Sequence, residues 1–258
     1  MRNAVRRSVI LETTPKEIVR LSSSSNTIPF FPNPAQAALR TTHAHLALTA
    51  GKATKYPADV APFGAIDDTT TEAYRDLHSL LLPGETIYVP DAPPADTPDL
   101  TWNGDIPCLQ FAYPADAPIF DTPTGPTISP LTCADAATML AHTDIAFPGL
   151  FRIRTCEMGS YFGIWQEGQL IAMCGERMSI NPWRELSGLC THPDHRGQGH
   201  AARLLAHLIQ HNRGIGLNSY LHVAANNQNA IALYKRLGFI LTGEVFLYRI
   251  SRTLESHS

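Results

Sequence analysis

The sequence predicts a mixed α/β fold, in which a sheet of strands is flanked by helices. In the helix expected at residues 200–212, apolar residues recur every three or four positions along one face. The strands expected on either side of it are short apolar runs bounded by glycine, proline or asparagine. The second half of the chain orders these elements as hairpin, strand, helix, strand, helix and strand, which is typical of a mixed α/β layout.

The first half, residues 1–125, predicts a smaller α/β domain with many loops. Residues 1–28 are polar and predict a loose arm or a short helix at 16–21. Many of the 20 prolines lie between Pro83 and Pro130, which favours extended chain over long helices. The other expected elements are helices at 35–50 and 71–82, strands at 86–89 and 108–113, and loops at 90–98 and 114–130.

The second half, residues 126–258, predicts a more regular domain. Thr132 is expected to cap the first helix, with Asp135 completing a capping box. Glu167 and Gly168 are expected to form the tight turn of the hairpin. The expected elements are a helix at 131–142, strands at 161–166, 169–178 and 183–191, a helix at 200–212, a strand at 218–224, a helix at 228–237 and the last strand or strands at 239–250.

The composition is that of a soluble globular protein. The 258 residues are 44% hydrophobic, and the mean hydropathy is -0.10. A net charge of -3 gives no electrostatic footprint for nucleic acid. No run approaches the ~20 apolar residues of a membrane span, and the apolar run at 9–11 is too short for a signal-peptide core. We therefore expect a cytoplasmic protein without nucleic-acid or membrane partners.

Cysteine and histidine spacing predicts neither disulfides nor a metal site. The five cysteines form an odd, scattered set without a C-x-x-C pair. His207 and His211 lie one helical turn apart, but Leu208 stands where the zincin pattern needs glutamate. The cysteines are Cys108, Cys133, Cys156, Cys174 and Cys190. Cys190 lies within an expected strand without an activating base, which favours a buried structural thiol.

Residues 185–201 combine a strand, a glycine-containing loop and the start of an amphipathic helix. A helix start presents unpaired N–H groups and the positive end of the helix dipole. Gly197, Gly199 and Ala201 are small enough for a phosphate to approach that backbone closely. The loop is therefore expected to hold an anion, and pyrophosphate fits it best.

Three phosphate-binding patterns compete for this loop. The P-loop needs a lysine, and none follows Gly199. The dinucleotide pattern could use Ala202 as its third small residue, but residues 213–225 contain no aspartate or glutamate for the ribose. The third pattern, R-x-x-G-x-[GA], is matched by Arg196, Gly199 and Ala201.

With this third pattern, the sequence resembles the GNAT N-acetyltransferase superfamily, whose acetyl-CoA pyrophosphate loop has the same form. Residues 227–239 resemble its second signature, N-x-x-A-x-x-L-Y-x-x-x-G-F, with one helix and one strand between the two motifs. Residues 148–151, 175–178 and 190–193 look most like the branch related to glycine N-acyltransferase. In that branch a degenerate GNAT-like half precedes the catalytic half, and residues 33–63 are similar to it.

The resemblance implies a GNAT-like sheet that splays between strands 184–191 and 218–224 and admits the pantetheine arm of acetyl-CoA. Asn227 would bond this arm or fix the following helix start, and the N–H of Leu189 would polarise the thioester carbonyl. The implied cofactor-binding residues are Leu189, Cys190, Thr191, Arg196, Gly197, Gln198, Gly199, His200, Ala201, Asn227 and Tyr234. No metal is implied.

The resemblance also implies direct acyl transfer from acyl-CoA to a primary amine in a ternary complex. Tyr234 would protonate the departing thiolate, and Glu185 would be the general base that takes the proton of the amine. Acetyl-CoA is the expected donor, and a longer acyl-CoA stays open. The acceptor is a small-molecule or peptide amine, and a homodimer stays open.

Other interpretations compete with the enzyme. A non-catalytic acyl-CoA-binding module or sensor would keep the pyrophosphate loop without needing Tyr234 or Glu185. An interaction protein with a decayed site would bind no CoA, and a nucleotide-dependent enzyme would bind ATP or NAD. Tyr161, Glu176, Arg177 and Trp183 lie where they could select the acceptor or simply pack.

Overall fold

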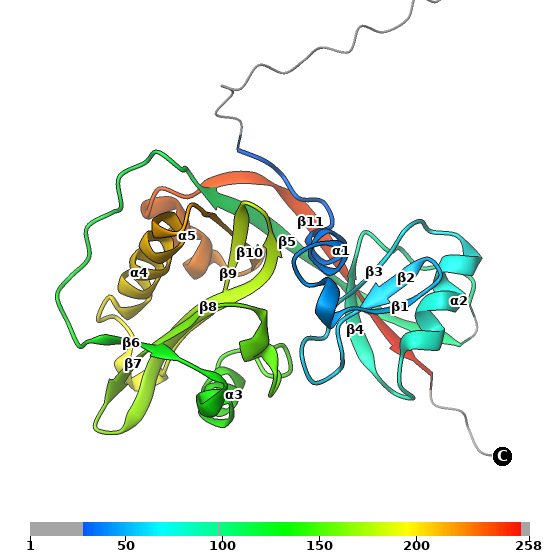
Figure 1. Cartoon of the computed structure of the whole chain (residues 1–258), viewed down its shortest axis with the longest axis horizontal. Helices are drawn as coiled ribbons and strands as arrows, with labels where there is room; N and C mark the ends of the chain where they lie inside the picture. Colours follow the sequence, from blue (N-terminus) through cyan, green and yellow to red (C-terminus); the bar gives the residue numbers. More distant parts are fainter. Residues whose placement is uncertain (1–27, 98, 254–258) are drawn as a thin grey trace, which may run out of the picture.

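The computed structural model describes residues 28–97 and 99–253. These residues form a large mixed sheet with helices on both faces and a separate three-stranded sheet (Figure 1). This confirms the predicted mixed α/β fold with a smaller α/β part near the N-terminus. The helix expected at residues 16–21 lies outside the described residues.

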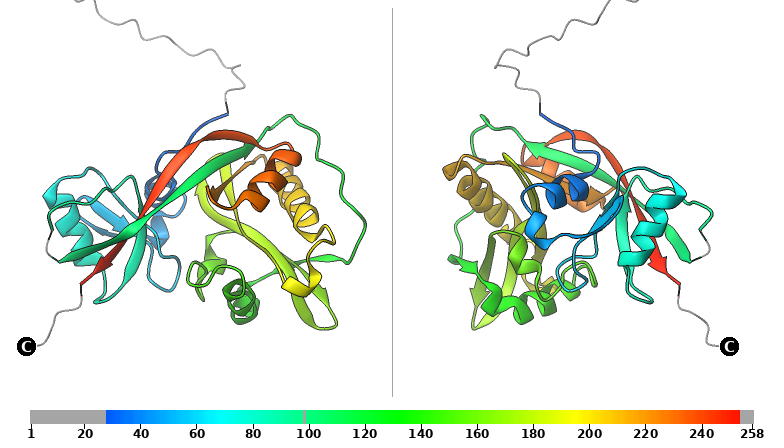
Figure 2. Two further views of the ribbon diagram at one scale, coloured as in Figure 1. Left: turned by 180° about the vertical axis from the view of Figure 1, so that it is seen from behind. Right: turned by 45° about the vertical axis from the view of Figure 1, so that its right-hand side comes forward.

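The large sheet has eight strands, and only one neighbouring pair is parallel. Its order is β4 (Thr86–Pro90), β11 (Ile240–Arg252), β5 (Leu100–Tyr113), β10 (Asn218–Ala224), β9 (Trp183–Thr191), β8 (Gln169–Ile180), β7 (Tyr161–Gln166) and β6 (Ile128–Leu131). β9 and β10 run parallel, whereas the other neighbours are antiparallel. Figure 2 shows β5 (green) and β11 (red) as two long strands that run side by side from the small sheet toward the helices that follow β9 and β10.

Strands from both halves of the sequence build this sheet. β4 and β5 precede residue 125, yet β5 lies between β11 and β10. The predicted domain division at residue 125 stays a prediction, and the sheet itself crosses it.

Helices cover the large sheet on two faces. α4 (His200–Gly214) and α5 (Gln228–Arg236) pack on one face, where Leu204, Leu205 and Leu208 share a core with Ile171 and Leu221. α3 (Ala136–Asp144) packs on the other face through Met139. The apolar stripe expected for residues 200–212 is therefore the face that α4 buries.

The small sheet consists of β1 (Leu48–Ala50), β2 (Ala53–Lys55) and β3 (Gly64–Ile66). α2 (Thr71–Leu80) packs against it, and α1 (Pro34–Arg40) lies between it and β8. Ile87 of β4 and Ile250 of β11 belong to the same buried cluster as the apolar face of α2. The two sheets therefore share a core where β4 begins and β11 ends.

The helix predicted at residues 35–50 is wrong beyond Arg40. After α1 the chain forms a 3-10 turn at Ala44–Leu46 and then β1. Thr41 ends α1 with a hydrogen bond from its hydroxyl to the Ala37 carbonyl, and the β-branched pair Thr41 and Thr42 disfavours further helix. Gly51, with φ of 48°, turns β1 into β2 and does not end a helix.

Smaller differences concern the ends of other elements. β5 begins at Leu100, eight residues before the predicted strand at 108–113, and the loop predicted at 114–130 ends in β6. The capping box of Thr132 and Asp135 is confirmed, but it caps a 3-10 turn (Cys133–Asp135) that leads into α3.

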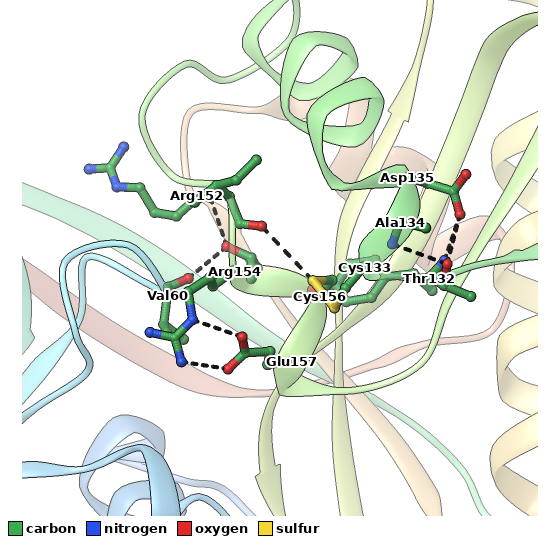
Figure 3. Close-up of a disulfide and its surroundings, with 12 residues drawn as sticks. Val60, Thr132, Cys133, Ala134, Asp135, Arg152, Arg154, Cys156 and Glu157 are labelled. Atoms are coloured by element: carbon green, nitrogen blue, oxygen red, sulfur yellow. Dashed lines mark hydrogen bonds and ion pairs between the residues drawn. A yellow bond between two sulfur atoms is a disulfide. The ribbon is translucent and has the colours of Figure 1, made fainter.

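A disulfide joins Cys133 and Cys156, which corrects the prediction that the chain has none (Figure 3). Cys156 lies in a further 3-10 turn (Thr155–Met158), and the Cα atoms of the two cysteines are 5.4 Å apart. Thr155 donates a hydrogen bond to the carbonyl of Val60 over 2.6 Å and so fixes this turn against the first half. An odd number of cysteines does not exclude one pair, and the fold brings these two together across 23 residues.

In the part of the chain that the structure describes, no helix is long and apolar enough to cross a membrane. Disulfides are typical of oxidising compartments. The expected cytoplasmic location therefore stays a prediction.

Alkylation of the denatured protein without reductant should modify Cys108, Cys174 and Cys190 but spare Cys133 and Cys156. Replacing both bonded cysteines by serine should lower the free energy of unfolding by about 3 kcal/mol, because the open chain gains conformational entropy. Peptide mass mapping and urea denaturation measure the two effects. Five alkylated thiols in the oxidised protein would contradict the disulfide.

Candidate active site

The parallel pair β9 and β10 separates partway along its length. Pairing runs from Trp183 and Asn218 to Leu186 and Leu221 and stops there. On its other edge β9 has an irregular register with β8 near Gly188, whose φ of 63° suits a bulge. The predicted splay is confirmed, and the backbone of residues 187–191 faces the opening.

The two strands form a fork where their pairing ends, after Leu186 of β9 and Leu221 of β10. A cavity of about 780 Å³ lies at this fork. Residues 186–191 of β9 and 222–224 of β10 line it from the two strands. Its volume is in the range of roughly 300–1,000 Å³ that is usual for small-ligand sites. The fork therefore opens into a space of the size that is usual for a small-molecule ligand.

Most of the predicted cofactor-binding residues line this one cavity. They are Leu189, Cys190, Thr191, Arg196, Gly197, His200, Ala201, Asn227 and Tyr234. Gln198, Gly199 and Glu185 are not among its lining residues. Two motifs that are separated in sequence by a helix and a strand thus meet at the same opening.

The glycine loop has the backbone conformation of an anion-binding helix start. Gly197 and Gly199 have φ of 77° and 78°, in the left-handed region that favours glycine. The first hydrogen bond within α4 joins the Arg203 N–H to the Gly199 carbonyl, so the N–H groups of the preceding helical residues are not used inside the helix. A Cβ atom at Gly199 would also lie 2.5 Å from Cγ of Pro123.

Two side chains at the helix starts have different roles. Asn227 accepts a hydrogen bond from the Ala230 N–H over 3.2 Å and caps α5, which is one of its two predicted roles. His200 is buried at the start of α4, and neither of its ring nitrogens has a partner among the described residues. Such buried unpartnered nitrogens beside a cavity are typical of a site that a polar ligand completes.

Tyr234 is a buried residue on α5 that lines the cavity and packs against the rings of Phe111 and Phe239. Burial, with a smaller contribution from Cys174, raises the pKa of its hydroxyl well above the ordinary value. The hydroxyl therefore stays protonated and can donate a hydrogen bond at any physiological pH. The same shift makes it a weaker acid than a tyrosine in water.

Glu185 is fully buried in a network of charged and polar groups. Nη2 and Nε of Arg177 donate to its two carboxylate oxygens over 2.6 and 3.0 Å. Nδ1 of His222 lies 2.8 Å from Oε1, and the Met178 N–H lies 3.2 Å from Oε2. The carboxylate thus links β8, β9 and β10 at the point where the fork begins.

This network makes Glu185 a poor direct base. Burial alone would raise the pKa of Glu185, but the Arg177 charge and the hydrogen bonds from His222 and Arg177 lower it well below the ordinary range. The carboxylate has low proton affinity and does not line the cavity. Its predicted role as the direct proton acceptor for an amine therefore has no support in this geometry.

His222 and Arg177 are the members of the network that line the cavity. Oε1 of Gln110 accepts a hydrogen bond from the Phe31 N–H, and this fixes the orientation of the Gln110 amide. The amide nitrogen Nε2 therefore faces His222 and donates to its Nε2 over 2.8 Å. His222 consequently carries its proton on Nδ1, facing Glu185. His222 is not predicted from the sequence, because its partners lie 37 and 112 residues away along the chain and are brought beside it only by strand pairing.

Comparison with known proteins now identifies the family. The sequence model of the acetyltransferase (GNAT) family matches residues 136–239. A solved acetyltransferase assigned to the GNAT family, from Novosphingobium aromaticivorans, is 30% identical over 86% of this chain and 98% of that one, with a TM-score of 0.76. The chain belongs to the GNAT family.

More distant structures share the GNAT fold. A GCN5-related N-acetyltransferase from Kribbella flavida is 16% identical, covers 83% of this chain and 95% of its own, and has a TM-score of 0.56. A GCN5-related N-acetyltransferase-like protein from Streptococcus suis is 13% identical, with 85% and 94% coverage and a TM-score of 0.54. No protein of curated function matches the sequence. The resemblance to the glycine N-acyltransferase branch stays a prediction.

Membership of the GNAT family makes acyl transfer the activity to be sought at the fork.

Burial raises the pKa of the Cys190 thiol to about 12, so this thiol is protonated and unreactive. The cysteine in the cavity wall is therefore a packing residue, as the sequence predicts.

Replacing Glu185 by glutamine should destabilise the fold at neutral pH by about 3 kcal/mol, because Arg177 keeps a buried charge without its partner. The pKa of Glu185 is lower in the folded than in the unfolded protein. Its contribution to stability is therefore present above the ordinary value of 4.5 and is lost as the pH falls below it.

The difference in unfolding free energy between wild type and Glu185→Gln should accordingly shrink as the pH is lowered from 5 to 3. Urea denaturation across this range measures it. The exposed Glu244→Gln is the matched control and should not differ from wild type. A difference that does not depend on pH would contradict the ion-paired carboxylate.

Proposed function

We propose that this GNAT protein transfers an acetyl group from acetyl-CoA directly to a primary amine. The observation that carries the proposal is that the glycine loop, the open edge of β9 and Tyr234 line one cavity. A pyrophosphate at the start of α4, a thioester beside β9 and a thiolate near Tyr234 are then consistent with a single extended ligand.

The loop residues fit the diphosphate of coenzyme A. Among the described residues, the N–H groups that precede Arg203 in α4 make no hydrogen bond within the helix, and with the helix dipole they favour an anion there. Arg196 lines the cavity beside them, and the two unpartnered ring nitrogens of His200 are available for a polar group. Gln198 and Gly199 contribute through the shape of the loop.

The transfer depends on the positioning of the amine and the thioester more than on a strong acid or base. The amine nitrogen attacks the thioester carbon, whose oxygen takes a hydrogen bond from the N–H of Leu189 on the unpaired edge of β9. Tyr234 stabilises the departing sulfur mainly by donating a hydrogen bond, because its raised pKa disfavours complete proton transfer. Glu185 orients Arg177 and His222, and the surplus proton of the amine leaves through the cavity to water.

A non-catalytic acyl-CoA-binding module or sensor is the alternative. It needs the pyrophosphate loop but gains nothing from a buried tyrosine at the sulfur position or from a cavity that extends past the fork. Both features favour an enzyme with a second substrate.

Tyr234→Phe should lower kcat for acetyl transfer by about tenfold or more, because the thiolate loses a hydrogen-bond donor. Acetyl-CoA affinity should stay nearly unchanged. Steady-state release of CoA thiol in the presence of an amine panel measures the rate. Tyr248→Phe, at a tyrosine that does not line the cavity, is the matched control.

Equal turnover of Tyr234→Phe and wild type would remove the tyrosine from the mechanism. Binding of acetyl-CoA without CoA release for any amine in the panel would favour the sensor.

A further inference from the structure

The cavity continues beyond the fork into a pocket with apolar walls. The first half of the chain contributes Phe63, Tyr88 and Ile106 to its wall, and β11 contributes Leu247. The loop between Cys133 and Cys156, which the disulfide closes, contributes Leu150 and Phe151. Phe63 and Phe151 are almost fully buried in the structure. A substrate group bound between these side chains is desolvated and must itself be apolar.

Among the described residues that line the cavity, the charged side chains are those of two arginines, Arg177 and Arg196. The ionisable nitrogen groups that line it are those of Arg177, His195, Arg196, His200 and His222, and no aspartate or glutamate of the described chain lines it. A polyamine or a lysine-rich peptide would bring additional ammonium groups into this space without a carboxylate to pair with them. The lining therefore favours an acceptor with a single amine, which becomes neutral before it attacks.

Arg177 offers a hydrogen-bond donor where the apolar pocket meets the fork. Its guanidinium lies 4.4 Å from the centroid of the Phe63 ring, and its Nε and Nη2 are held by Glu185. Among the described residues Nη1 has no hydrogen-bond partner, and the side chain is 14% exposed. Glu185 keeps the guanidinium rigid and oriented, so Nη1 can bind an acceptor oxygen in a fixed position.

We propose that the acetyl acceptor is a free α-amino acid with an apolar side chain, whose carboxylate binds Nη1 of Arg177 and whose side chain occupies the pocket around Phe63. This inference rests on the proposed acetyl transfer. The α-amine then lies between the two groups and faces the fork. An amino acid combines one amine, one anion and one apolar group, which are the three features that the cavity can accommodate.

The chemistry balances without a further reactant. The α-ammonium first loses one proton to water. The amine then forms the C–N bond, the C–S bond of the thioester breaks, and the second nitrogen proton is released as the CoA thiolate becomes a thiol. The products are the N-acetyl amino acid, CoA thiol and one proton.

A set of matched acceptors tests this proposal on the wild-type protein with acetyl-CoA. L-Phenylalanine should exceed L-phenylalaninamide and 2-phenylethylamine in kcat/KM by about tenfold, the contribution of one charge-assisted hydrogen bond to a guanidinium that Glu185 already balances. L-Phenylalanine should also exceed glycine, and spermidine should not be acetylated. An amide or amine that is used as well as the acid, or a preference for spermidine, would overturn the proposal.

Two variants separate the carboxylate from the side chain. Arg177→Lys keeps a cation beside Glu185 but has no Nη1 donor for the substrate carboxylate. It should therefore lower the ratio of kcat/KM for L-phenylalanine to kcat/KM for 2-phenylethylamine about tenfold, whatever it does to the two rates together. Phe63→Ala should raise KM for L-phenylalanine more than for glycine. Arg249→Lys, at an exposed arginine outside the cavity, is the control and should match wild type.

The outcomes distinguish a wrong acceptor class from a wrong reaction. Acetylation of spermidine or a lysine peptide without acetylation of amino acids overturns the acceptor class and leaves acetyl transfer standing. Absence of transfer to every amine, with acetyl-CoA bound, overturns both.

Discussion

The structure depends on the separation of two parallel strands. β9 and β10 pair over four residues and then diverge, which leaves one edge of β9 without strand partners inside a sheet of eight strands. Unpaired backbone in a protein interior is costly unless something else satisfies it. The buried pair of Glu185 and Arg177, with His222, joins three strands where the divergence begins. The buried ion pair and the apolar core under α4 and α5 thus hold the fork in place. An extended ligand is the natural partner for the open edge of β9.

The first half of the chain takes part in the site, although it carries no phosphate loop. β5 lies inside the large sheet, and Phe63 and Tyr88 stand in the cavity wall. Thr155 hydrogen-bonds Val60, so the loop closed by the disulfide is held against the same half. One side of the cavity therefore comes from the GNAT motifs, and the opposite side comes from the remainder of the chain. The proposed reaction assigns cofactor recognition to the first of these parts and acceptor recognition to the second.

Local patterns predict much of this structure, and long-range pairing decides the rest. The strands at 183–191 and 218–224 and the helix start at His200 follow from apolar runs and glycines, and the structure has them at the same residues. The helix predicted at 35–50 is wrong beyond Arg40, because the prediction gave more weight to the apolar residues of this segment than to Thr41 and Thr42 at its centre. Glu185 was found by its place on a strand, but its partners Arg177 and His222 are set by strand register. The disulfide likewise depends on two turns whose proximity no spacing rule reveals.

The central claim is that the loop at Gly199 binds coenzyme A. Isothermal titration calorimetry with acetyl-CoA, CoA, ATP and NAD tests it on wild type, Gly199→Val and Gly216→Val. Both glycines have a positive φ, but an added Cβ at Gly199 would lie 2.5 Å from Cγ of Pro123, whereas at Gly216 it would meet no described atom within 4 Å. The account predicts that wild type and Gly216→Val bind acetyl-CoA and CoA alike, and that Gly199→Val loses at least about tenfold in affinity. Binding of ATP or NAD in the absence of any heat from acetyl-CoA and CoA would contradict it.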